Sequence, residues 1–287
     1  MADFRMTKKA EMEFGRELRK LAPEIWRIMK PHIRGHEILR ADEMEAALLA
    51  YSKIIEPWAS EVSKRTLESI NLNNQRAWKH ATRKIGGLMR TTLLKTPVGA
   101  IARNLHDRQV GYITTLPLDA GIRAQKLARE AFLGGRRADE VARELSRSEG
   151  ISARHGMLIA RTEVAKANAT FTQARAEYAE LTHYIWRTLD DMQVRPAHRE
   201  MANRVFRFDA PPEVEGEGAH GPGEIWNCRC YAEPIVPENI LHGYVADVDS
   251  ELDVERNAYV ARTDSPLAAW EKPGATQTPK SIYSVDW

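Results

Sequence analysis

Apolar side chains recur at helical spacing through most of the first 180 residues, and at Thr182 the pattern changes to the alternation of a strand. This change constrains the fold more than any single motif. It predicts an α+β chain in three parts: a helical region from 1 to 150 that serves as scaffold or adaptor, a small helix-plus-antiparallel-sheet domain from 151 to 236, and an extended polar tail from 237 to 287.

Proline, glycine and aspartate divide the first helical segments. Pro31 and Gly35 should end a helix that starts near Lys8. Asp42 is the predicted N-cap of the next helix, with Glu45 three residues later as its capping-box partner. Pro57 should kink this helix or start a new one.

The stretch from Thr96 to Pro117 has a weaker helical pattern, and its prolines and glycines predict short elements and turns. Asp119 should then open an amphipathic helix that Gly134 and Gly135 end. A short helix is expected at 136–146, and a long alanine-rich helix should run from Ser152 to Tyr178.

Three candidate strands follow Thr182. They cover residues 183–189, 205–208 and 229–236, which are rich in β-branched and aromatic residues. Between the second and third lies a segment of proline, glycine and glutamate, from Ala210 to Gly223, which we expect to be a loop.

Composition excludes several classes of protein. The 287 residues are 43% hydrophobic and 29% charged, which is typical of a globular chain. The net charge of +2 gives no strong overall attraction to nucleic acid, and no apolar run approaches the ~18 residues of a membrane span. The N-terminus lacks the apolar core of a secretory signal, and two cysteines one residue apart predict a reducing compartment.

A basic segment between Asn73 and Lys95 has two interpretations. It is either a solvated helix face or, as the alternative, a surface that contacts the phosphates of DNA. The candidate DNA contacts are Arg76, Lys79, Arg83, Lys84 and Arg90.

Both cysteines of the chain lie in the sequence Asn227-Cys228-Arg229-Cys230. If this segment is a regular strand, the two thiols point to opposite faces, and a shared metal would require a turn or bulge. His183, His198 and His220 could add nitrogen ligands, but C-x-C is not the spacing of common zinc sites. We therefore expect buried free thiols and no cofactor, with His198, Cys228 and Cys230 as the candidate ligands of a structural zinc.

A catalytic interpretation of the same stretch is also possible. Cys228 and His198 could form a triad with an aspartate, or Asp190, Asp191, His198 and Glu200 could serve a hydrolase or nuclease. A simpler interpretation is a loop-and-cap network. In that network Asp191 caps a helix from Val194 to Met201 and Arg195 pairs with an acid.

The order of the motifs is more specific than any one of them. Arg161-Thr162-Glu163 lies on a helix and is followed by Trp186-Arg187-Thr188, then by Asp190 or Asp191, Arg195-x-x-His198, the Pro211-Pro212 loop and Asn227-Cys228-Arg229-Cys230. From about 150 to 236 this series resembles the phage Mu F-like minor head proteins, also called the phage head morphogenesis family. Relatives tend to have glycine where this chain has Asn203, and asparagine is the other residue that best tolerates a left-handed turn.

The resemblance implies a component of the virion and not an enzyme. Such proteins are present in few copies, associate with the portal or the inner surface of the capsid, and assist head assembly and genome packaging or release. The expected partners are the portal protein, the major capsid protein and phage DNA, with no membrane and no small-molecule substrate. The expected location is the head interior or portal vertex, reached from the host cytoplasm during assembly.

The signature residues would then brace the small domain from within. They are Arg161, Glu163, Trp186, Asp190, Arg195, His198, Asn227, Cys228, Arg229 and Cys230. Of these, Arg161 and Glu163 would pair either with the rest of the cluster or with the helix bundle. Two hypotheses from other classes stay open: a hydrolase or nuclease effector that uses Asp190, His198 and Cys228, and a DNA-binding accessory that uses the basic segment.

Overall fold

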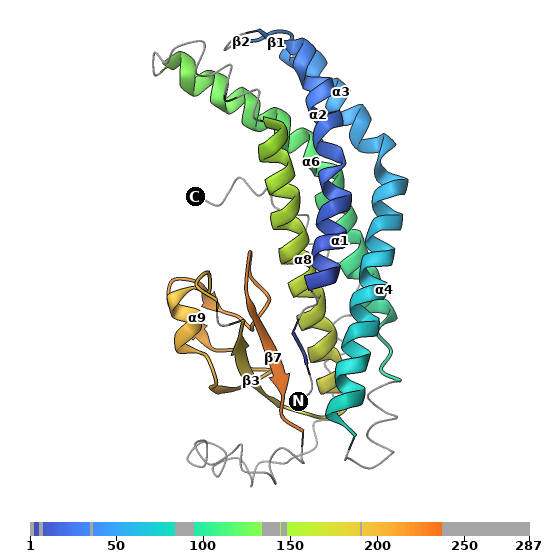
Figure 1. The fold of residues 1–287 in the computed structure, drawn as a ribbon, viewed down its shortest axis with the longest axis vertical. Helices are drawn as coiled ribbons and strands as arrows, with labels where there is room; N and C mark the ends of the chain where they lie inside the picture. Colours follow the sequence, from blue (N-terminus) through green and yellow to red (C-terminus); the bar gives the residue numbers. More distant parts are fainter. Residues whose placement is uncertain are drawn as a thin grey trace. The chain divides into compact units, whose positions relative to one another are not determined.

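A computed structural model describes residues 3–5, 8–34, 37–83, 95–133, 144, 148–189 and 191–236. It confirms the α+β class: a mostly helical N-terminal region precedes small antiparallel sheets between residues 183 and 234 (Figure 1). The described chain divides into two compact units. Unit 1 combines residues within 1–7, 68–104 and 164–236, and unit 2 combines those within 8–67 and 105–163. The predicted tail from 237 to 287 lies outside the described residues.

The first helices of unit 2 follow the predicted pattern with different boundaries. They are α1 (Lys8–Arg19) and α2 (Leu21–Met29), followed by the 3-10 turn η1 (Lys30–His32) and a two-stranded hairpin of β1 (Ile33–Arg34) and β2 (Glu37–Ile38). Pro31 lies in the 3-10 turn, where its missing N–H costs little. The helical pattern therefore ends close to the predicted position.

The predicted N-cap at Asp42 is wrong. Helix α3 (Ala41–Ile54) begins one residue before Asp42. Its N-cap is Arg40, which has a left-handed conformation and makes no side-chain cap bond. Asp42 lies in the first turn of the helix, where a carboxylate still complements the positive end of the helix dipole. Helix α4 (Glu56–Ala81) begins after Ile55, so Pro57 occupies its first turn, and the predicted restart is confirmed.

The predicted turns between Thr96 and Pro117 are also wrong, because one helix, α6 (Gly99–Leu133), spans this stretch with Pro117 inside it. Ile113, Leu116 and Ala120 are buried on both sides of the proline. Burial of this apolar face outweighs the single backbone hydrogen bond that proline removes. Asp119 lies within the helix and does not open it, and the predicted stop at Gly134 and Gly135 lies outside the described residues.

Helix α8 (Ser148–Tyr178) contains the long alanine-rich segment. In unit 2 it packs closely on α1, because a Cβ at Gly15 would collide with Met157 and one at Gly156 would lie 3.1 Å from Leu18 Cβ. The predicted short helix at 136–146 falls on residues that, apart from Glu144, lie outside the described ones.

The small sheet of unit 1 confirms the three predicted strands. Its order is β4 (Val205–Arg207), β3 (His183–Thr188) and β7 (Cys230–Pro234), all antiparallel, with β3 in the centre (Figure 1). Asn203, in the turn before β4, has φ +66°, which is the left-handed conformation that the comparison with glycine predicted.

The segment predicted as a loop contains a second, two-stranded hairpin. Its strands are β5 (Glu213–Val214) and β6 (Gly218–Ala219), and Gly216 and Gly218 supply the positive φ angles that its turn requires. Val214 is buried and anchors the hairpin on the sheet. The hairpin therefore holds the residues between its strands in a fixed position.

The N-terminal segment contributes Phe4 to an apolar cluster of unit 1. Phe4 is buried, its ring meets that of Trp78 edge-on at 5.1 Å, and its carbonyl accepts a hydrogen bond from Asn168 Nδ2 (2.8 Å). The cluster also contains Ala77, Ala176, Leu181 and Val236. Residues near the start of the chain thus stabilise the helices that carry the sheet.

Candidate functional site

The signature residues meet beside the sheet, around a buried tryptophan. Trp186 on β3 is 0% exposed, and its ring contacts the rings of His198 (5.4 Å) and His220 (5.8 Å). His198 comes from the short helix α9 (Pro196–Glu200), which starts at proline as helices often do. The apolar cluster around them contains Tyr184, Trp186, Val194, Val214, Cys228, Cys230 and Ala232.

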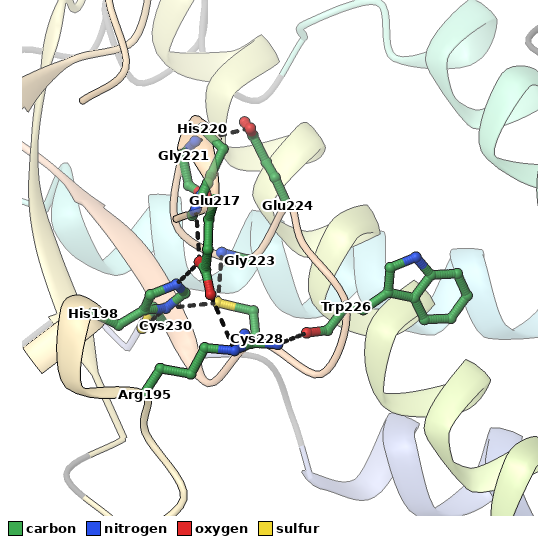
Figure 2. Close-up of polar contacts among 10 residues, drawn as sticks. All are labelled: Arg195, His198, Glu217, His220, Gly221, Gly223, Glu224, Trp226, Cys228 and Cys230. Atoms are coloured by element: carbon green, nitrogen blue, oxygen red, sulfur yellow. Dashed lines mark hydrogen bonds and ion pairs between the residues drawn. The ribbon is translucent and has the colours of Figure 1, made fainter. Parts of the chain in front are cut away.

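Both thiols lie on the same side of His198. Its Nδ1 is 3.3 Å from Cys230 Sγ and 3.6 Å from Cys228 Sγ (Figure 2). Opposite faces are expected only if this segment is a regular strand, and that condition is not met at Cys228. The strand begins only at Cys230, and Asn227, with φ +54°, turns the chain so that Cys228 enters the same cluster.

Glu217 connects this cluster to the β5–β6 hairpin. One carboxylate oxygen accepts hydrogen bonds from His198 Nε2 (2.7 Å) and His220 Nε2 (3.1 Å), and the other lies 3.2 Å from Arg195 Nε (Figure 2). The prediction that Arg195 pairs with an acid is thus confirmed. The Glu217 side chain is 22% exposed, so these bonds are partly shielded from water.

Backbone contacts fix the loop that carries Cys228. Arg195 Nη2 donates to the Trp226 carbonyl (2.8 Å), and the Gly223 N–H donates to Cys228 Sγ (3.3 Å). Gly223 has φ +92°, and a Cβ there would lie 3.2 Å from Ala169 Cβ on α8. This position therefore requires glycine for both its conformation and its space.

The two thiols differ in acidity. A hydrogen bond from Cys230 lowers the pKa of Cys228 well below its ordinary value, against burial, and His198 lowers it further. That same bond and burial raise the pKa of Cys230. Burial opposes the charge on His198, but Cys228 and then Glu217 outweigh it and raise the pKa of the imidazole. The cluster is thus arranged for a thiolate beside an imidazolium.

Other members of the predicted cluster have separate partners. Arg161 pairs with Glu11 on α1 (2.9 Å), and Glu163, which is 0% exposed, pairs with Arg108 on α6 (3.0 Å). These two residues brace the helices of unit 2. Asp190 lies outside the described residues.

Arg229 points away from the thiols. Its guanidinium contacts Asp191 Oδ2 and Gln193 Oε1. The predicted capping role of Asp191 is wrong, because α9 begins at Pro196 with Arg195 as its N-cap, and Asp191 Oδ1 accepts instead from the Gln193 N–H (3.0 Å).

A family comparison covers the part of the chain that contains this site. Residues 123–233 match the family described as phage Mu protein F like protein, a phage head morphogenesis family. The chain carries a Mu F-like domain. The matched span takes in the end of α6, all of α8 and the strands β3 to β7. It starts earlier than the resemblance alone indicated.

One curated relative, an uncharacterized protein of Haemophilus influenzae (strain ATCC 51907 / DSM 11121 / KW20 / Rd), is 30% identical over 117 residues. These residues are 41% of this chain and 25% of the relative, so the chain spans about a quarter of that protein's length. No solved structure matches the chain significantly. None of the helices in the described part of the chain combines the length and apolarity that a membrane crossing requires.

Local sequence pattern does not identify Glu217, which bonds to His198, His220 and Arg195 beside the two thiols. These residues with Cys228 and Cys230 are named the Mu F-like cluster. Glu217 sits in a segment rich in glutamate and glycine, where nothing in the local pattern separates it from Glu213, Glu215 or Glu224. The one available signal was Gly216 and Gly218 on either side of it, which is typical of a tight hairpin turn. His220 was considered as a metal ligand and does lie in the cluster.

Two of the candidate DNA contacts, Arg76 and Lys79, lie near the end of α4, and Arg83 follows the helix. Arg76, Lys79 and Arg83 are exposed, and the first two share one face of the helix at a spacing of three residues. Lys84 and Arg90 lie outside the described residues. The exposed positions agree with either interpretation of the basic segment.

Proposed function

We propose that this chain is a minor head protein of a phage, bound at the portal or the inner surface of the capsid, where it assists head assembly and genome packaging or release. The observation that carries the proposal is the Mu F-like domain at 123–233. The ordered set of signature residues supports it, because the domain uses most of them as internal contacts.

The geometry favours a structural role over catalysis. His198 and Cys228 are each 1% exposed, and Cys230 is 5% exposed. Arg195 and Glu217 neutralise each other at the edge of the cluster. A buried and internally paired network of this kind stabilises one conformation of a domain, and loss of one partner is costly.

The proposed partners are the portal protein and the major capsid protein, with phage DNA as a further contact of the basic end of α4. The exposed Arg76 and Lys79 fit the phosphate backbone, which is recognised by charge and not by sequence. The proposed location is the virion.

The test is the composition of purified heads. Heads from an induced host should contain the chain in few copies, held through washes that remove loosely bound protein. Heads assembled without the portal are the matched control for portal binding, and they should lose the chain if the portal holds it. Recovery of the chain only in the soluble lysate, with none in heads, contradicts the proposal.

One observation favours a second function. Cys228, His198 and Glu217 form a chain of contacts in which a thiol, an imidazole and a carboxylate follow one another, as in a cysteine hydrolase. This alternative requires that the buried thiol become accessible to substrate. Rapid alkylation of Cys228 in the native full-length chain, together with hydrolysis of a model ester that Cys228→Ser abolishes, would favour it over the structural role.

A further inference from the structure

We propose that Cys228 Sγ, Cys230 Sγ and His198 Nδ1 bind a zinc ion. The three ligand atoms come from two segments, α9 and the turn before β7, and all lie within 4.8 Å of one another. This site is independent of the proposed role in the head. It replaces the expectation of free thiols that the C-x-C spacing suggested.

The distances agree with tetrahedral coordination. With Zn–S bonds of ~2.3 Å and Zn–N bonds of ~2.0 Å, a sulfur and a nitrogen on one zinc ion lie about 3.5 Å apart. His198 Nδ1 lies 3.3 Å from one thiol and 3.6 Å from the other. A single ion between the three atoms therefore requires only small movements.

The surroundings of His198 are those of a ligand. Metal-binding histidines commonly donate their other ring N–H to a carboxylate, which fixes the tautomer and orients the ring. Glu217 occupies this position, 2.7 Å from Nε2. Trp186 packs edge-on against the same imidazole at 5.4 Å and further fixes its orientation. The free nitrogen of the ring thus faces the two sulfur atoms.

A second group of residues could be drawn as a metal site but fits less well. His198, Glu217 and His220 also lie close together, yet the Glu217 carboxylate already has the Arg195 guanidinium at 3.2 Å. A metal ion on Glu217 would lie beside this positive charge. The two thiols are softer donors than the Glu217 carboxylate. The positive charge of Arg229, the residue between the two cysteines, is paired with Asp191.

The donor set selects the ion. Two thiolates and one imidazole suit zinc, and they do not suit calcium or magnesium, which take oxygen ligands. Binding releases to solvent the proton of the Cys230 thiol and the proton that the His198 imidazolium carries at Nδ1. Three protein ligands leave the fourth position of the tetrahedron to a water molecule, and the Gly223 N–H, 3.3 Å from Cys228 Sγ, supports the adjacent thiolate.

The experiment measures metal in the purified full-length chain. We expect one zinc per chain by elemental analysis. A strong chelator should remove it, lower the melting temperature by several degrees and expose both thiols to a thiol reagent. Added zinc should restore the melting temperature at a ratio of one to one. Cobalt in place of zinc should give the thiolate charge-transfer absorption of a Co–S bond.

Three variants locate the site. Cys228→Ser and Cys230→Ser should each lose stoichiometric zinc, while the matched control His220→Gln should keep it, because His220 bonds to the same Glu217 oxygen as His198 but does not belong to the three proposed ligands. Glu217→Gln should bind zinc about 10- to 100-fold more weakly. If the cysteine variants fail to fold, zinc is titrated into the chelator-treated wild-type chain. Recovery of the melting temperature at one zinc per chain then supports the site, and no response contradicts it.

Two results would overturn the site. One is a wild-type chain that holds no zinc as purified and whose melting temperature responds to neither zinc nor chelator. The other is retention of zinc by both cysteine variants together with its loss in His220→Gln, which would place the ion on the opposite side of His198.

Discussion

Glu217 on the β5–β6 hairpin and His198 on α9 are 19 residues apart in sequence and joined by a 2.7 Å hydrogen bond. Through this bond a segment that looks like a surface loop in the sequence becomes part of the core. The same carboxylate oxygen accepts from His220, and the other oxygen pairs with Arg195. The hairpin thereby closes the Mu F-like cluster from the side opposite the thiols.

Gly223 should tolerate no side chain. In Gly223→Ala the new Cβ meets Ala169 Cβ at 3.2 Å and the Ala165 carbonyl at 3.3 Å, in a backbone conformation with φ +92°. The matched control is Gly216→Ala, which has φ +74° but nothing within 4 Å. Both variants should lose ~1 kcal/mol of unfolding free energy because alanine disfavours the left-handed conformation. Gly223→Ala should lose about 1–3 kcal/mol more, measured by urea unfolding. Equal losses would contradict the close approach of this loop to α8.

Phe4 should contribute strongly to stability despite its place near the start of the chain. Phe4→Ala removes a side chain that is 2% exposed and its edge-on contact with Trp78. We expect a loss of about 3 kcal/mol in the free energy of unfolding. Arg5→Ala, at an exposed neighbour, should change it by less than about 0.5 kcal/mol. A Phe4→Ala chain as stable as wild type would show that the N-terminal segment does not pack as described.

Unit 2 should show two opposing pH effects. Burial, with some help from Arg123, lowers the pKa of His155 to about 4, and burial raises the pKa of Asp119 to about 6. Between pH 4 and 6.5 the unfolded chain binds more protons at His155, so this group adds stability as pH rises. Between pH 3.8 and 6 the folded chain binds more protons at Asp119, so that group removes stability as pH rises.

Difference curves separate the two effects. The stability of wild type minus that of His155→Gln should increase from pH 4 to 6.5. The stability of wild type minus that of Asp119→Asn should decrease from pH 4 to 6. Each slope should be at most about 1.4 kcal/mol per pH unit. Chemical unfolding across this range measures both slopes, and slopes of the same sign would contradict the described burial of His155 and Asp119.

The basic end of α4 should bind DNA through phosphates if the proposed contact is right. Replacement of Arg76 and Lys79 by alanine should weaken binding equally for unrelated sequences and reduce the slope of log affinity against log salt by about 2. Lys64 and Arg65, exposed on the same helix, are the matched control pair and should leave the slope unchanged. If the slope is unchanged in the Arg76/Lys79 variant, these residues form a solvated helix face and do not contact DNA phosphates.

Local sequence pattern was sufficient to predict the strands but not the helix that contains Pro117. Residues 183–188 carry β-branched and aromatic side chains, so the strand is visible in the sequence, and Tyr184, Ile185 and Trp186 within it are all buried. Pro117 and the glycines before it have the signature of turns, and the burial of an apolar face that includes Ile113 and Leu116 keeps the helix continuous. Burial depends on packing against other elements, which a local pattern does not contain.

The residues of the cluster were likewise predictable from the sequence only in part. The sequence predicts that Arg195, His198 and Cys228 lie together, because they belong to one family signature. It does not predict the side of His198 on which the thiols lie, since that depends on the left-handed turn at Asn227. Nor does it identify Glu217 among the four glutamates between residues 213 and 224, because the partner of Glu217 is set by the fold of the hairpin.

The most direct test of this account compares Glu217→Gln with Glu215→Gln in equilibrium urea unfolding of the full-length chain. Both changes remove one negative charge from the same hairpin, but only Glu217 bonds to His198, His220 and Arg195. We predict that Glu217→Gln lowers the free energy of unfolding by about 1–3 kcal/mol, while Glu215→Gln changes it by less than about 0.5 kcal/mol. Equal stability of the two variants would contradict the claim that the hairpin holds the Mu F-like cluster together through Glu217.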